Sequence, residues 1–157
     1  MKEKKKKQPA KRSKSPSGDL GVPAKRSKSP SGDLGATFPI VALGASAGGL
    51  EAFTQFFKAC PPDTGMAFIV VAHLDPTHIS LLPDLLQKQT DMPVCQVTDN
   101  KKIQPNTVYV IPPNTDLSIL NRVLYLLPPP LARGMNLPID SLFRSLALDQ
   151  AQHAAAI

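Results

Sequence analysis

The sequence is poor in several features that define protein classes. Its 157 residues include no tryptophan and two cysteines, Cys60 and Cys95, with no second Cys or His at metal-ligand spacing. This pattern excludes a disulfide framework and favours buried free thiols in a reducing cytoplasm. No run of about 18 apolar residues is available to cross a membrane. The basic start lacks the apolar stretch of a signal peptide, so we expect a cytoplasmic protein without membrane insertion.

The excess positive charge is confined to residues 1–35. They contain 11 Lys and Arg against 3 Asp and Glu, whereas residues 36–157 contain 7 against 9. Residues 9–21 (PAKRSKSPSGDLG) recur unchanged as residues 23–35. Because this repeat is short and polar, it cannot bury enough apolar surface to offset the entropy lost on ordering. We therefore predict that residues 1–35 are a disordered tail and that residues 36–157 form the domain. The tail has no aromatic residues to stack on bases, so we do not expect nucleic acid as a partner. The alternative is that the basic tail binds weakly to an anionic surface.

Apolar runs alternate with helical patterns in the predicted domain. Strands are predicted at residues 38–44, 67–72, 94–97 and 107–111. Leu50, Phe53 and Phe57 share one face of a helix after the first strand, and Ser80 is placed to cap a second helix. Strands alternating with helices predict an α/β fold with a doubly wound, mostly parallel sheet and helices on both faces.

The second half of the domain adds a different pattern. Residues 117–120 and 123–127 are short extended pieces, and Asn121-Arg122 between them fits the turn of a small β-hairpin inserted on the sheet. Asp140 is placed to cap a last helix. The sequence ends at Ile157, where we expect a further strand to begin, so the predicted sheet is incomplete at its C-terminal end.

One motif lies between the first strand and the first helix. Gly44-Ala45-Ser46-Ala47-Gly48 matches G-x-S-x-G, in which a sharp turn lifts a serine hydroxyl clear of the sheet. Gly44, Ala45, Ala47 and Gly48 must be small to allow that turn. The amide of Ala47 and the positive end of the next helix then point to where an oxyanion would form.

A serine nucleophile needs a base, and His73 follows the second predicted strand. Adjacent parallel strands lie about 4.8 Å apart. We therefore expect Ser46 and His73 to approach within roughly 2.6–3.2 Å or somewhat more. Of the other histidines, we place His78 in a loop and His153 on the last helix.

On pattern alone, three interpretations of the glycine-rich turn stay open: an esterase nucleophile, a phosphate-binding turn, and a purely structural turn. The P-loop lysine is missing, and His73 stands where a dinucleotide fold would need an acidic residue; Asp75 is the nearest one. The spacing of His73, Asp75 and His78 matches no common metal site, so we predict no metal.

Four ordered segments carry a resemblance to a known family: GASAGGLEAFTQFF, AFIVVAHLDPTH, PNTVYVIPPNTDL and LPIDSLFRSLA. From Phe38 onward they resemble the catalytic domain of CheB-type chemotaxis methylesterases, especially the form in CheB–CheR fusion proteins. That resemblance implies a Ser-His-Asp triad that hydrolyses glutamate γ-methyl esters on chemoreceptor helices, with Ser46 as nucleophile and His73 as base. It implies no cofactor. A CheR-type methyltransferase module is a further implied partner.

The sequence also departs from the family pattern. Ala47 stands where many members have threonine, and Ala72 where many have glutamine. The family's aspartate lies in a later segment that the sequence does not reach, and Asp75, Asp140 and Asp149 are poorly placed to replace it. We therefore expect the 157-residue chain to be a weak esterase. The alternative function is a catalytically silent fragment that binds receptors or another partner.

Overall fold

The computed structural model of the protein describes residues 37–46, 48–72, 76–128 and 138–157, with the backbone alone at residues 76–80. The predicted tail, Ala47, His73 and Asp75 lie outside the described residues.

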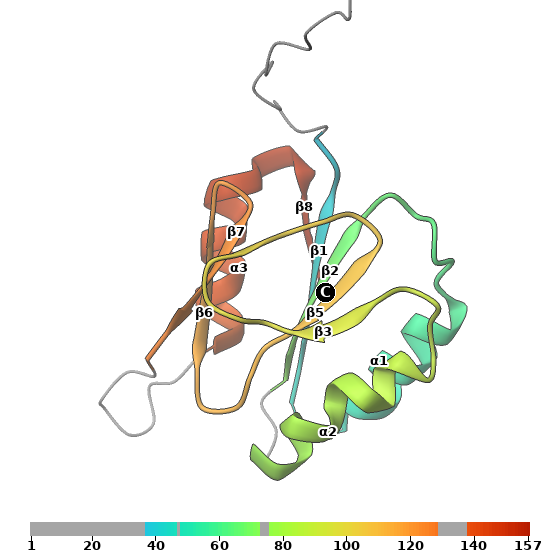
Figure 1. Ribbon diagram of the computed structural model, residues 1–157. Helices are drawn as coiled ribbons and strands as arrows, with labels where there is room; N and C mark the ends of the chain where they lie inside the picture. The colour runs from blue at the N-terminus through green and yellow to red at the C-terminus, as the bar shows by residue number, and fades with distance from the viewer. Residues whose placement is uncertain (1–36, 47, 73–75, 129–137) are drawn as a thin grey trace, which may run out of the picture. The chain divides into compact units, whose positions relative to one another are not determined.

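Five strands form a parallel sheet in the order β3-β5-β2-β1-β8 (Figure 1). Their bounds are β1 Ile40–Ala45, β2 Ala67–Ala72, β3 Val94–Gln96, β5 Thr107–Val110 and β8 Ala154–Ala156. Every residue of β2, in the middle of the sheet, is buried. A strand covered on both faces has no solvent side, which explains its unbroken apolar run AFIVVA.

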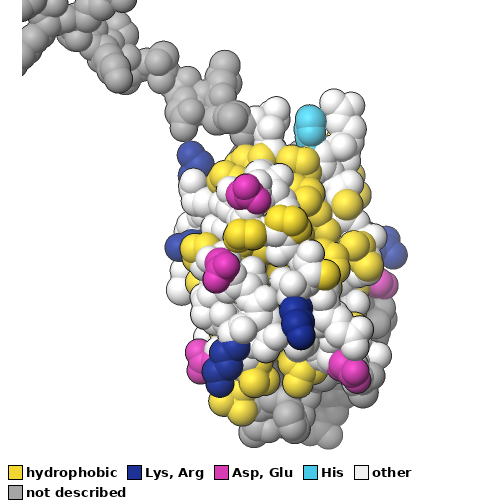
Figure 2. All heavy atoms as spheres, turned by 90° about the vertical axis from the view of Figure 1, so that its right-hand side faces the viewer, with side chains coloured by type: hydrophobic (Ala, Val, Ile, Leu, Met, Phe, Trp, Pro, Cys, Tyr) yellow, Lys and Arg dark blue, Asp and Glu magenta, His cyan; other side chains and the backbone are white. Residues whose placement is uncertain are grey.

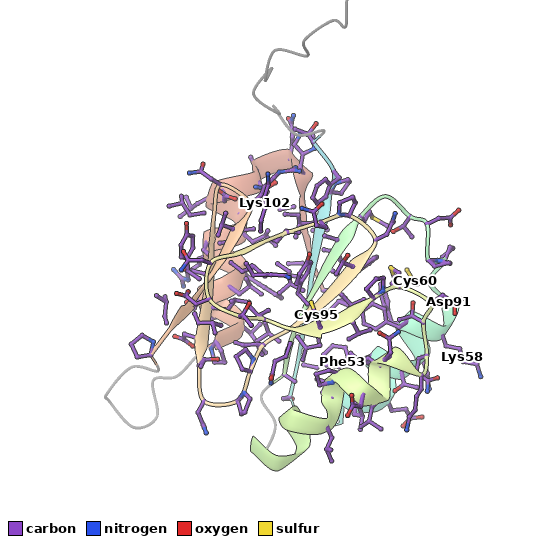
Figure 3. All side chains as sticks on the ribbon, in the orientation of Figure 1. Phe53, Lys58, Cys60, Asp91, Cys95 and Lys102 are labelled. Atoms are coloured by element: carbon purple, nitrogen blue, oxygen red, sulfur yellow. The ribbon has the colours of Figure 1, made fainter. Side chains whose placement is uncertain are left out.

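Two helices cover one face of this sheet. They are α1 (Gly49–Ala59) and α2 (Pro76–Gln87), and α1 packs Phe53 and Phe57 against alternate strand residues such as Leu43. Figure 3 shows Phe53 on the sheet side of α1 and Lys58 pointing away from it. This is the amphipathic division that the apolar spacing predicted.

The opposite face is covered by helix α3 and a small antiparallel sheet. Helix α3 spans Pro138–Gln150, and the small sheet has the order β4-β7-β6, with bounds Lys101–Lys102, Val123–Leu127 and Asp116–Leu120. Leu142 and Leu146 of α3 join the buried cluster formed by the other alternate strand residues, among them Ala42 and Val71. Helices therefore lie on both faces, and the doubly wound α/β fold with its hairpin is confirmed.

The hairpin turn lies where the sequence placed it. Asn121 and Arg122 have φ of 52° and 62° and join β6 to β7. Two positive φ values are typical of the type I′ turn, whose twist matches that of the strands. The Asp149 carboxylate accepts hydrogen bonds from both backbone amides, at 2.6 and 3.1 Å. The Arg122 guanidinium also lies over the Phe38 ring, 4.3 Å from its centroid.

Several boundaries differ from the predictions. Helix α2 begins at Pro76 and α3 at Pro138, so neither Ser80 nor Asp140 is an N-cap. Proline at the start of a helix loses no hydrogen bond and has the right φ, which favours these earlier starts. The short β4, which pairs with β7, was not predicted. The last residues form the further strand themselves, because β8 pairs with β1 and Ile157 exchanges backbone hydrogen bonds with Ala42 and Gly44.

The α1–α2 side carries a mixed surface. Figure 2 shows hydrophobic side chains there interspersed with Lys, Arg, Asp and Glu. Leu81 and Leu85 of α2 are among the exposed leucines. None of the helices in the described ranges is long and apolar enough to span a bilayer.

Candidate active site

The serine of the G-x-S-x-G motif lies directly after β1. Ser46 is exposed, and its carbonyl oxygen accepts a hydrogen bond from the amide of Gly49, the first residue of α1, at 3.0 Å. Gly48 between them has φ 97° and ψ −13°, a left-handed conformation that favours glycine. The chain thus turns from strand to helix within three residues and leaves the serine at the surface.

The strand end before Ser46 is held tightly against α3. A Cβ atom on Gly44 would lie 2.7 Å from Cγ2 of Ile139 and 3.1 Å from the Phe143 ring. Only glycine lets the helix approach this closely, because real Cβ atoms do not show contacts under 3.0 Å. Gly44 therefore fixes the distance between the serine turn and the first turn of α3.

The start of α1 provides backbone donors beside the serine. Helix α1 has 11 residues, and its N-cap Gly48 makes no side-chain capping hydrogen bond. The first amides of a helix lack intrahelical partners and carry the positive end of the helix dipole. The turn therefore has the chemistry to stabilise a negative charge that develops beside Ser46. The amide of Ala47, predicted to contribute, belongs to a residue outside the described set.

The end of β2 lies beside the end of β1. The two strands are parallel, and their last pair is Ala45 with Ala72. In the sequence, Ser46 comes directly after β1 and His73 directly after β2, although His73 itself is outside the described residues. Side chains alternate between the faces of a sheet. Gly44 and Val71, which pair with each other, both lie on the face that packs against α3 and the hairpin.

The other two histidines are elsewhere in the fold. Residue 78 belongs to α2, so the prediction that His78 lies in a loop is wrong. His153 lies in the short 3-10 helix η1 (Ala151–His153), which leads into β8. Because Ala154 pairs with Ile40 at the start of β1, His153 is at the opposite end of the strand from Ser46.

The structure adds one acidic residue, Asp116, that is not among the predicted site residues. Asp116 opens β6 and is 9% exposed, and its Oδ1 atom is buried without a hydrogen-bond partner among the described residues. Burial raises the pKa of its carboxyl group. The sequence signal was available, because Asp116 follows the strand predicted at residues 107–111, at its carboxyl end. The predicted strand began one residue too late, at Leu117.

Two of the acidic residues weighed from the sequence, Asp140 and Asp149, lie on α3. Asp149 is occupied by the hairpin turn at the far end of α3. Asp140 is exposed in the first turn of that helix. Cys60, directly after α1, and Cys95 on β3 are free thiols (Figure 3), but both are only half-buried, so the prediction that they are buried is wrong. Burial raises the pKa of both thiols, which disfavours the thiolate form needed for a cysteine nucleophile.

Comparison with known proteins gives one consistent result. The family model described as CheB methylesterase matches residues 41–157. A protein named protein-glutamate methylesterase/protein-glutamine glutaminase from Desulfotalea psychrophila is 27% identical over 113 residues, covering 68% of this chain and 31% of the relative. One of the same name from Mesorhizobium japonicum is 37% identical over 71 residues, covering 45% of this chain and 21% of the relative. The chain thus spans less than a third of the length of either relative.

A solved structure shows the same fold. The catalytic domain of Thermotoga maritima CheB methylesterase superimposes with a TM-score of 0.67 at 20% identity, covering 77% of this chain and 66% of that chain. The serine turn at the carboxyl edge of a parallel sheet, this fold and the match over residues 41–157 agree. The chain belongs to the CheB methylesterase family.

Proposed function

We propose that this protein hydrolyses γ-methyl esters of glutamate side chains on chemoreceptors, with Ser46 as nucleophile and His73 as general base. The observation that carries the proposal is the pairing of Ala45 with Ala72 at the ends of two adjacent strands. In the sequence, the exposed Ser46 follows Ala45, and His73 follows Ala72. The family match and the names of the relatives support it.

The proposed reaction has two halves. The Ser46 hydroxyl oxygen attacks the ester carbonyl while His73 takes the hydroxyl proton. Backbone amides at the start of α1 stabilise the tetrahedral oxyanion, and His73 returns the proton to the departing methanol. Water then attacks the acyl-enzyme, again with His73 as base, and releases the glutamate carboxylate and free Ser46. Atoms balance as ester plus water giving acid plus methanol, so the proposal requires no cofactor.

The proposed substrate fixes the proposed partners and location. The ester-bearing side chains belong to cytoplasmic receptor helices, so the protein would act in the cytoplasm. Methyl esters must be made before they are removed, so a CheR-type methyltransferase module, in this protein or another, is the proposed counterpart. Ser46 is exposed, which suits a macromolecular substrate because a receptor helix has to reach the nucleophile from outside.

The test is to treat the folded chain with a fluorophosphonate and, separately, with a peptide bearing a glutamate γ-methyl ester. We expect covalent labelling and methanol release, both lost in Ser46→Ala with a drop of about 10³-fold or more. Ser141→Ala, in the first turn of α3, is the matched control and should retain both. Equal labelling of the Ser46→Ala variant would refute the proposal. An intact fold that neither labels nor hydrolyses would leave a receptor-binding module instead.

Amide hydrolysis is a second candidate, because the relatives' names include protein-glutamine glutaminase. The same acyl-enzyme would form on a glutamine side chain, with ammonia leaving in place of methanol. Ammonia release from a matched glutamine peptide tests this, and it should disappear with Ser46→Ala. Hydrolysis of the ester peptide alone would restrict the activity to esters.

A further inference from the structure

The serine turn has an acidic side chain on its α1 side. The Ser46 carbonyl accepts a hydrogen bond from the Gly49 amide at 3.0 Å, which fixes the first turn of α1 beside the serine. Glu51 is the acidic residue of that turn. Its Oε1 atom accepts a hydrogen bond from Nε2 of Gln55 at 3.1 Å, and the side chain is exposed. A carboxylate is therefore held at the surface in the same helical turn as the residue that bonds to Ser46.

A second acidic side chain lies on the α3 side. The first turn of α3 packs against the end of β1, since a Cβ atom on Gly44 would lie 2.7 Å from Cγ2 of Ile139. Asp140, the next residue, is exposed and is the acidic residue of that turn. Figure 1 shows α1 and α3 on opposite sides of β1. The helix starts on both sides of the strand that leads into Ser46 thus carry an acid.

Negative charge predominates in the first two turns of these helices. Residues 49–55 carry Glu51 as their charged side chain, and residues 138–144 carry Asp140 and Arg144. An acid in the first turn stabilises a helix, because it complements the positive end of the helix dipole. Helix stability alone therefore explains each acid, and a role in the reaction has to follow from the chemistry.

The proposed reaction changes the charge of the side chain in the site. The ester substrate is neutral, whereas the product carboxylate is negative at neutral pH. The amides at the start of α1 that stabilise the oxyanion also attract this carboxylate. A negative charge in the same helical turn opposes that attraction and acts only weakly on the neutral ester. The oxyanion is attached covalently to Ser46 and cannot leave, whereas the carboxylate product is free to dissociate.

We propose that Glu51 and Asp140 are specificity-determining residues, which lower the affinity of the site for the carboxylate product relative to the neutral ester. A demethylated receptor helix then competes poorly with a methylated one for Ser46. This inference rests on the proposed function, because it takes a glutamate ester as the substrate.

The test compares the binding of two peptides, one with a glutamate γ-methyl ester and one with free glutamate at the same position. Every variant also carries Ser46→Ala, which prevents hydrolysis. NMR shifts of the backbone amides at the start of α1 give the two dissociation constants. The measured quantity is the Kd of the acid peptide divided by the Kd of the ester peptide.

Removing the acids should lower this ratio. We expect Glu51→Gln to lower it about two- to fivefold in dilute buffer, and Glu51→Gln with Asp140→Asn to lower it further. In 0.5 M NaCl the change should shrink, because the screening length falls to about 4 Å. Asp63→Asn is the matched control. It removes an exposed carboxylate beyond the C-terminal end of α1 and should leave the ratio unchanged.

Two results would overturn the inference: a ratio that the double substitution leaves unchanged, or one that Asp63→Asn lowers as much. A purely structural role of the acids predicts the first result, because lost helix stability weakens the binding of both peptides alike. Neither measurement depends on turnover. Fluorophosphonate labelling that persists in Ser46→Ala would defeat the proposed function whatever the ratio. Labelling that is lost in Ser46→Ala, with an unchanged ratio, would defeat this inference alone.

Discussion

The two faces of the central sheet are built from alternate residues of the same strands, yet they differ in chemistry. On the α1–α2 face, the buried side chains among the described residues are hydrophobic, and the rings of Phe56, Phe57 and Phe68 meet edge to face at 5.2 to 5.9 Å between centroids. On the α3–hairpin face, polar side chains enter the core. The Tyr109 hydroxyl accepts a hydrogen bond from the backbone amide of Gln104 at 2.8 Å. The Ser145 hydroxyl accepts one from the backbone amide of Ile119 at 3.2 Å.

The difference follows from what covers each face. A helix satisfies its own backbone hydrogen bonds, so α1 and α2 need only apolar side chains toward the sheet. A small sheet packed on another sheet brings strand ends and turns into the interior, and their amides need partners. Polar groups are therefore already present on the α3–hairpin face. That is the face on which Gly44, two residues before Ser46, packs against α3, and it carries Asp116.

The largest stability effect should come from the hydrophobic face. Phe57 is 1% exposed and contacts both neighbouring rings, so Phe57→Ala should lower the free energy of unfolding by about 3–5 kcal/mol through lost burial and a cavity. Urea denaturation followed by circular dichroism measures this. Leu148→Ala is the control, since Leu148 is 88% exposed and should change stability by less than about 0.5 kcal/mol. Equal losses would mean that the hydrophobic face does not dominate stability.

An intermediate effect should come from the contact between β1 and α3. Gly44→Ala places a methyl group 2.7 Å from Ile139 Cγ2, so we expect a loss of about 1–3 kcal/mol and a displaced serine turn. Combining it with Ile139→Ala, which removes that atom, should cost less than the sum of the two single changes. A double-mutant cycle by urea denaturation measures the coupling. Strict additivity would show that this contact does not fix the turn.

The smallest effect should come from a polar group of the α3–hairpin face. Tyr109→Phe leaves the Gln104 amide without its acceptor and should cost about 1–2 kcal/mol at neutral pH. Burial raises the pKa of the Tyr109 hydroxyl above its ordinary value of 10.0. The contribution of this group to the free energy of unfolding is therefore complete below pH 10.0, and it is lost as the pH rises through the pKa of Tyr109 in the folded protein.

The difference in the free energy of unfolding between Tyr109→Phe and the unsubstituted protein should therefore become smaller above pH 10. Urea denaturation at several values between pH 8 and 11 measures this difference. Tyr125→Phe on half-exposed β7 should have little effect at neutral pH. A stability difference that grows with pH would contradict the raised pKa of Tyr109.

Much of the fold was predictable because its signals are local. The apolar run AFIVVA gave β2 with both ends correct, the spacing of Phe53 and Phe57 gave the buried face of α1, and Asn121-Arg122 marked the hairpin turn. The predicted helix starts are too late because Pro76 and Pro138 begin the helices, ahead of the capping residues Ser80 and Asp140. β4 has two residues and exists by pairing with β7, so no local pattern announces it.

For the candidate site, the sequence by itself determined the serine turn, because a strand, a G-x-S-x-G motif and an amphipathic helix follow one another within 20 residues. It also set His73 after the second strand. Only the tertiary structure decided that these strands are adjacent with Ala45 opposite Ala72, and that Asp116 is buried at the same end. The physical reason is that pairing and burial join residues far apart in the chain. A local sequence pattern does not indicate which distant segment will pack against it.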